Sequence, residues 1–181
     1  MPMELRSAAL LLGWVVAAVG AALAAAPAPV RDWSARFPRM KPAAWMLTAL
    51  DLLWSAWLVY QMPLEGFDNL KPLLYVLTPA TFVLVVMLLD DLLAPRALGG
   101  LLLLIPCPLL DVQRWHPSPW RAVVAVLAYA VAGMGFALVL NPYQFRKVMT
   151  IVTANDRRCR LLGALTGAAG TGVVILALTK Y

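Results

Sequence analysis

The sequence predicts an all-α fold, a polytopic membrane helical bundle of about six transmembrane helices in a single membrane domain, residues 1–181. Composition is the first observation, because 62% of the residues are hydrophobic and only 13% are charged. Soluble domains are about 45–50% apolar and about 25% charged, so a water-soluble domain is excluded. The second observation is a series of apolar runs, most of them long enough to cross about 30 Å of hydrocarbon. These runs lack the alternating pattern of barrel strands and are therefore expected to be helices.

Six apolar segments follow one another along the chain, over residues 5–26, 42–61, 73–94, 97–112, 120–140 and 159–179. The first of them also has features of a secretory signal, since Arg6 precedes the apolar run and Ala-Ala-Ala-Pro follows it at 24–27. We interpret this segment as the first transmembrane helix, because it takes part in the internal repeat described below.

The fourth segment, 97–112, is the weakest of the six. Pro106 and Pro108 remove two backbone donors and are expected to kink or break the helix. Two alternatives follow. The segment is either a short, bent span or a re-entrant segment whose freed carbonyls are covered by protein or water.

Two basic loops, 27–41 and 141–158, hold most of the 15 lysine and arginine residues. Positive residues collect in the cytoplasm, so six crossings place both termini in the periplasm of a bacterial inner membrane. A re-entrant fourth segment would put the two basic loops on opposite sides, so the charge pattern favours six crossings. The net charge of +6 is explained by these loops and does not indicate nucleic-acid binding. Contacts with lipid headgroups are predicted for Arg31, Arg36, Arg39, Lys41, Arg146, Lys147, Arg157 and Arg158.

The first and last helical hairpins resemble one another at a fixed offset of 115 residues. The match includes Gly20 with Gly135, Pro27 with Pro142 and Arg31 with Arg146. We interpret it as a parallel repeat of units 5–61 and 120–179, separated by a middle hairpin, 73–112. Each unit is predicted to consist of a helix, a proline, a basic interfacial segment and a second helix. In the second copy, residues 143–149 are predicted to form a short amphipathic helix.

The last hairpin, about 128–178, resembles the YjeT-like family of small two-helix bacterial inner-membrane proteins. The resemblance rests on the Gly135-rich helix end, on Pro142 followed by Phe-Arg-Lys-Val-Met at 145–149, and on Asn-Asp-Arg-Arg at 155–158 before a glycine-containing helix. That family has no assigned activity. The resemblance therefore implies a membrane topology and no catalytic residue.

Asp51 is the candidate for intramembrane chemistry, because it lies near the centre of the second segment. A carboxylate there costs about 2.5–3.5 kcal/mol on insertion scales, so it is expected to face protein or water. No basic residue lies at the same depth, so the carboxyl group is expected to be largely protonated. Thr48 and Ser55 share its helical face. One interpretation is a proton- or ion-coupling site, and the other is a structural hydrogen bond to a neighbouring helix.

Small residues form stripes on three of the predicted spans. Such stripes let helix backbones approach closely, either within this bundle or against another subunit. The residues concerned are Gly13, Ala17, Gly20, Ala132, Gly135, Gly163, Gly167 and Gly170.

Recognisable catalytic motifs are missing from the sequence, and no cofactor or metal is predicted. His116 lies in a predicted outer loop, and Asp90 and Asp91 close the third segment at a predicted interface, where solvation is the ordinary outcome. We therefore predict a non-enzymatic accessory, assembly or scaffold subunit of a larger inner-membrane complex. Its expected partners are membrane lipids and other integral membrane subunits or further copies of the chain. The alternative is a small proton- or ion-coupled transporter or channel that uses Asp51.

Overall fold

The computed structural model describes residues 5–63, 68–88, 92–114 and 120–180, and within these ranges all regular structure is helical. Six helices are long and apolar enough to cross a membrane. They are Leu5–Ala25, Lys41–Gln61, Asp68–Leu88, Leu93–Arg114, Arg121–Leu140 and Asp156–Thr179. The predicted helical class and the predicted number of candidate spans are confirmed.

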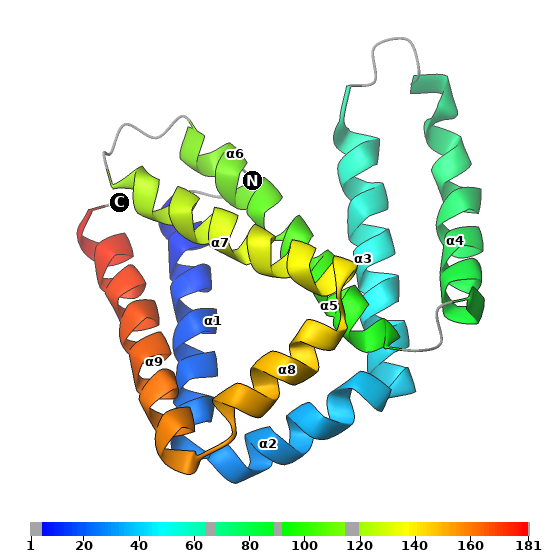
Figure 1. The fold of residues 1–181 in the computed structure, drawn as a ribbon. Coiled ribbons are helices and arrows are strands. Elements are labelled where there is room, and N and C mark those ends of the chain that lie inside the picture. The colour runs from blue at the N-terminus through cyan, green and yellow to red at the C-terminus, as the bar shows by residue number, and fades with distance from the viewer. Residues whose placement is uncertain (1–4, 64–67, 89–91, 115–119, 181) are drawn as a thin grey trace.

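The helices of the first and last units pack across the molecule rather than within their own units. Helix α1 (Leu5–Ala25) forms a long antiparallel pair with α9 (Asp156–Thr179), the most extensive contact in the fold (Figure 1). Helix α7 (Arg121–Leu140) packs on α5 (Leu93–Leu104), and α5 also packs on α3 (Lys41–Gln61). Helix α5 therefore lies between α3 and α7 and joins the two sides of the bundle.

The fourth span is a broken helix that runs on in the same general direction (Figure 1). Helix α5 ends at Leu104, and α6 (Pro106–Arg114) begins at Pro106, which is favourable at the first position of a helix because its missing N–H has no helical partner there. The thiol of Cys107 donates to the Leu103 carbonyl at 4.0 Å across this break. Together the two pieces are long enough to cross a membrane, as the alternative of a bent span predicts.

The boundary between the third and fourth spans differs from the prediction. The sequence placed residues 92–94 at the end of the third segment, but Leu92 is the N-cap residue of α5 and Leu93 and Ala94 are its first residues. Leu92 has a φ of 58°, a left-handed conformation that ends the preceding direction of the chain and starts the new helix. Hydropathy assigned residues 92–94 to the third segment because they are apolar and only Asp90 and Asp91 separate them from it in the sequence.

The third span stands at the side of the bundle. It consists of a 3-10 turn, η2 (Asp68–Leu73), and α4 (Leu74–Leu88), and no residue of either is buried. Helix α4 packs chiefly on α3, and only Val85 and Val86 near its C-terminus reach a buried cluster (Figure 1).

Two short helices, α2 (Pro27–Arg36) and α8 (Tyr143–Val152), lie across one end of the bundle and contact one another (Figure 1). The predicted helix at 143–149 is confirmed. The segment 27–41 was expected to be a basic interfacial loop, yet it contains α2 and a 3-10 turn, η1 (Phe37–Arg39). Pro27 starts α2, and Trp33 and Phe37 stack with ring centroids 4.8 Å apart. That spacing of four residues is the helical signal that the sequence analysis missed.

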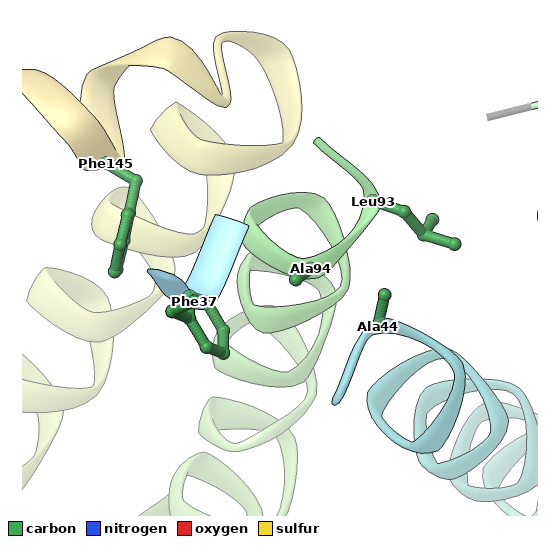
Figure 2. Packing of buried hydrophobic residues seen from close by; sticks show 5 residues of the cluster. All are labelled: Phe37, Ala44, Leu93, Ala94 and Phe145. Atoms are coloured by element: carbon green, nitrogen blue, oxygen red, sulfur yellow. The ribbon is translucent and has the colours of Figure 1, made fainter. Parts of the chain in front are cut away.

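A small core joins these two short segments to the long helices. Phe37 of η1 packs on Phe145 of α8 (Figure 2). Their ring centroids lie 5.2 Å apart. Ala44, Leu93 and Ala94 complete the buried cluster. The beginnings of α3 and α5 are therefore held beside α8.

Candidate functional site

The small-residue face predicted on the first span is packed against the last span. A Cβ atom added at Gly20 would lie 2.2 Å from the backbone nitrogen of Gly167 and 2.7 Å from the carbonyl oxygen of Gly163. At Gly170 it would lie 2.3 Å from the backbone nitrogen of Ala17, and at Gly13 it would lie 2.8 Å from a methyl group of Val174. The α1 and α9 backbones thus touch at several points, which only small residues permit.

The second small-residue face, on α7, is also used inside the bundle. A Cβ atom at Gly135 would lie 2.7 Å from the carbonyl oxygen of Gly99 in α5, and Ala132, one turn earlier, is half-buried. Gly99 was not singled out in the sequence, although the Gly99-Gly100 pair inside an apolar run is a signal that could have found it. Both faces therefore serve internal packing, and a partner protein would have to bind elsewhere.

Asp51 points from α3 toward α5. Its Oδ2 lies 2.7 Å from the position that a Cβ atom of Gly100 would take, so the missing side chain at Gly100 makes room for the carboxyl group. Its Oδ1 is buried and has no hydrogen-bond partner among the described residues. The structure therefore brings Asp51 against a neighbouring helix but supplies no donor to that oxygen.

Thr48 and Ser55 do not interact with Asp51. The Thr48 hydroxyl donates to the carbonyl of Ala44 at 2.8 Å, and the Ser55 hydroxyl donates to the carbonyl of Leu52 at 3.0 Å. Each bond stays within α3 and satisfies the hydroxyl locally. The polar face predicted from the sequence is thus reduced to a single unsatisfied carboxyl oxygen.

Arg31 links α2 to the residues that follow α8 at the basic end of the molecule. Its Nε donates to the carbonyl of Thr153, just after α8, at 2.9 Å, and its Nη2 donates to Oδ1 of Asp156, the first residue of α9, at 2.6 Å. The guanidinium group thus joins α2 to the turn between α8 and α9. Asn155 caps the same helix by accepting from the backbone N–H of Arg157 at 3.1 Å.

Arg146 occupies a different environment, because it lines a cavity of about 420 Å³ with Arg39 and Lys41. Arg39 and Arg146 are exposed, and neither forms an ion pair or hydrogen bond with any residue that the structure describes. The cavity is completed by the residues around the starts of α3 and α5, namely Pro38, Met40, Ala44, Trp45, Leu92, Leu93 and Ala94. The sequence singled out the three cations but could not show that they surround one cavity.

The other basic residues predicted to contact headgroups are exposed at this same end of the bundle, on α2, α8 and the start of α9. They are Arg36, Lys147, Arg157 and Arg158. Asp90, Asp91 and His116 lie outside the described residues. Within the part of the chain that the structure describes, no three His, Cys, Asp or Glu side chains gather in a group suited to a metal ion. Cys107 and Cys159 are both free.

No family model, curated protein or solved structure matches this chain. The function must therefore be argued from the geometry, and the resemblance of the last hairpin to the YjeT-like family stays a prediction.

Proposed function

We propose that the chain is an integral protein of a bacterial inner membrane, with six crossings and both termini in the periplasm. In that membrane it serves as a non-enzymatic accessory, assembly or scaffold subunit of a larger complex. The topology is supported by charge, because α2, η1 and α8 carry the basic residues at one end of the bundle, while α1 begins and α9 ends at the opposite end (Figure 1).

The observation that carries the accessory role is the isolation of α4. Together with η2, α4 is long and apolar enough to cross a membrane, yet no residue of either is buried in the fold. Its exposed side chains are large and apolar, and they include Val83, Leu84 and Met87. The small-residue faces of α1, α7 and α9 are occupied internally, and α4 is the spanning helix with no buried residue, so we assign the partner helix to the outer face of α4.

We further propose that units 5–61 and 120–179 descend from one hairpin. Equivalent glycines, Gly20 and Gly135, both lie at close backbone contacts between helices. Arg31 meets Thr153 and Asp156, and Arg146 lines a cavity with Pro38 and Lys41, the positions 115 residues before those two. Such reciprocal contacts are expected of two copies related by an axis along the membrane normal.

The test is gentle-detergent purification of the tagged protein from its native membranes, with mass spectrometry of the proteins that accompany it. We expect a larger membrane complex in stoichiometric amounts. Leu84→Trp should release that complex, because the indole blocks the outer face of α4. Leu165→Trp on α9 is the matched control, since Leu165 is also an exposed leucine on a spanning helix. Recovery of the chain alone, or only as a homo-oligomer, would contradict the accessory role.

A transporter or channel is the second candidate, and the unpartnered Oδ1 of Asp51 is the observation that favours it. A carboxyl group without a structural partner is free to exchange a proton or an ion. Under this proposal, Asp51→Asn abolishes ion flux in reconstituted vesicles and leaves the co-purifying complex unchanged. A loss of complex with flux intact would refute the transporter proposal.

A further inference from the structure

The two equivalent arginines, Arg31 and Arg146, lie in different electrostatic surroundings. Arg31 forms an ion pair with Asp156 and donates a hydrogen bond to the carbonyl of Thr153. At the offset of 115 residues, the position equivalent to Asp156 is Lys41, which lines the same cavity as Arg146. The acid that binds the first arginine is thus replaced by a base beside the second. Three cationic residues, Arg39, Lys41 and Arg146, thus line one cavity, and the described residues offer no acid to Arg39 or Arg146.

The remaining lining of this cavity suits an anion with an apolar extension. Lys41 is the first residue of α3, so the cavity lies at the N-terminus of that helix, where the helix dipole adds positive potential. Trp45 lies one turn further along α3, and Leu92, Leu93 and Ala94 contribute apolar surface from the start of α5. A volume of about 420 Å³ falls within the range of small-molecule sites, about 300–1,000 Å³.

We propose that this cavity binds the phosphate group of an anionic phospholipid, with Arg39, Lys41 and Arg146 around the phosphate and Trp45 beside the ester region. Guanidinium groups pair with phosphate oxygens through two parallel hydrogen bonds, so the two arginines supply specificity as well as charge. The lipid source rests on the proposed membrane location, because the basic end of the bundle then lies at the level of the headgroups. It does not depend on the accessory role.

The test uses the full-length protein in nanodiscs of phosphatidylcholine that contain roughly 20–30% phosphatidylglycerol. This composition provides an anionic leaflet. Native mass spectrometry after release counts the lipids that stay bound. We expect retained phosphatidylglycerol, with at least a tenfold loss of retention in Arg146→Gln and in Arg39→Gln. Arg36→Gln and Lys147→Gln are matched controls, since both residues are exposed cations on the same end of the bundle but do not line the cavity. They should retain the lipid.

Three results would overturn the proposal. Equal losses in all four variants would mean diffuse attraction to an anionic surface, and full retention in Arg146→Gln would mean that the cavity is not the site. In a third arm, inorganic phosphate is added to detergent-solubilised protein. Saturable stabilisation by phosphate that depends on Arg146, without retention of lipid, would assign the cavity to a soluble phosphate. Each result is read without reference to a co-purifying complex, so failure here is distinguishable from failure of the accessory role.

Discussion

Units 5–61 and 120–179 begin with the same glycine, proline and arginine pattern but end in different surroundings. In the first unit, Gly20 of α1 packs directly on the backbone of α9. In the second unit, Gly135 of α7 packs on α5 instead of on α3, because α5 lies between those two helices. The comparison teaches that the shared pattern determines a helix, a turn and a face for close packing. The partner of that face depends on which other helix is present.

The insertion of α5 also explains the position of Asp51. On the α1 and α9 side, two helices meet through glycines and other small or apolar residues, with backbone against backbone at Gly20. On the other side, α3 meets α5 through a carboxyl group that occupies the space left by Gly100. One side of the bundle is therefore closed by backbone contact, and the other contains a buried oxygen without a partner.

The largest effect is expected from Gly20→Ala, which disrupts the close backbone contact between α1 and α9. Gly20→Ala should lower the free energy of unfolding by about 3 kcal/mol and Gly135→Ala by about 1–2 kcal/mol, because neither added methyl group has room and its neighbours are backbone atoms. Gly133→Ala is the control, since nothing lies within 4 Å of its added Cβ atom. It should be neutral or stabilising by about 0.5–1 kcal/mol. Unfolding in mixed micelles, followed by tryptophan fluorescence, measures all three. Equal effects at Gly133 and Gly20 would argue against the α1–α9 contact.

A smaller effect on the free energy of unfolding is expected from replacing the two arginines, and it should differ between Arg31 and Arg146. Arg31→Gln should cost about 0.5–1 kcal/mol, because it removes a half-exposed ion pair and a bond to the Thr153 carbonyl. Arg146→Gln in lipid-free detergent should cost nothing measurable, since Arg146 has no partner among the described residues. A double-mutant cycle of Arg31→Gln with Asp156→Asn isolates the ion pair. A coupling energy of zero would show that Arg31 and Asp156 do not act together.

The smallest effect is expected from Lys41→Asp, which makes the surroundings of Arg146 resemble those of Arg31. Lys41→Asp places a carboxylate beside Arg146, as Asp156 lies beside Arg31, and it puts an acidic residue in the first turn of α3. Relative to Lys41→Gln, which removes the same lysine contacts, we expect a gain of about 0.5 kcal/mol in the free energy of unfolding in detergent, together with loss of retained phosphatidylglycerol. Combining it with Arg146→Gln should remove the gain. A gain that persists in the double variant would come from the helix dipole alone.

The local sequence pattern was sufficient to predict those elements whose signal lies within a single segment. Hydropathy located the six candidate spans, the prolines at 106 and 108 located the break between α5 and α6, and the Tyr143–Val152 segment was recognised as a helix. The missed elements have weaker local signals. Over residues 27–41 the charges obscured the spacing of Trp33 and Phe37, and the apolar residues 92–94 resemble the end of the preceding span, although they begin the next one.

The candidate sites were less predictable because each depends on two segments that are distant in the sequence. The sequence listed Arg31 and Arg146 together as headgroup contacts, and it could not show that Asp156 reaches one of them while Lys41 lies by the other. It likewise identified Asp51 without Gly100. A stripe of small residues predicts close packing, but it does not name the helix that packs there.

By itself, the sequence determined the helical class, the number of candidate spans, the broken fourth span and the end of the bundle that carries the positive charge. These follow from hydrophobicity, proline chemistry and the position of basic residues, which act over one or two turns of chain. Only the tertiary structure decided that α1 pairs with α9, that α5 separates α3 from α7, and that Arg39, Lys41 and Arg146 surround one cavity. Such choices arise because several helices with similar apolar faces compete for the same neighbours, and the outcome depends on how all of them fit together at once.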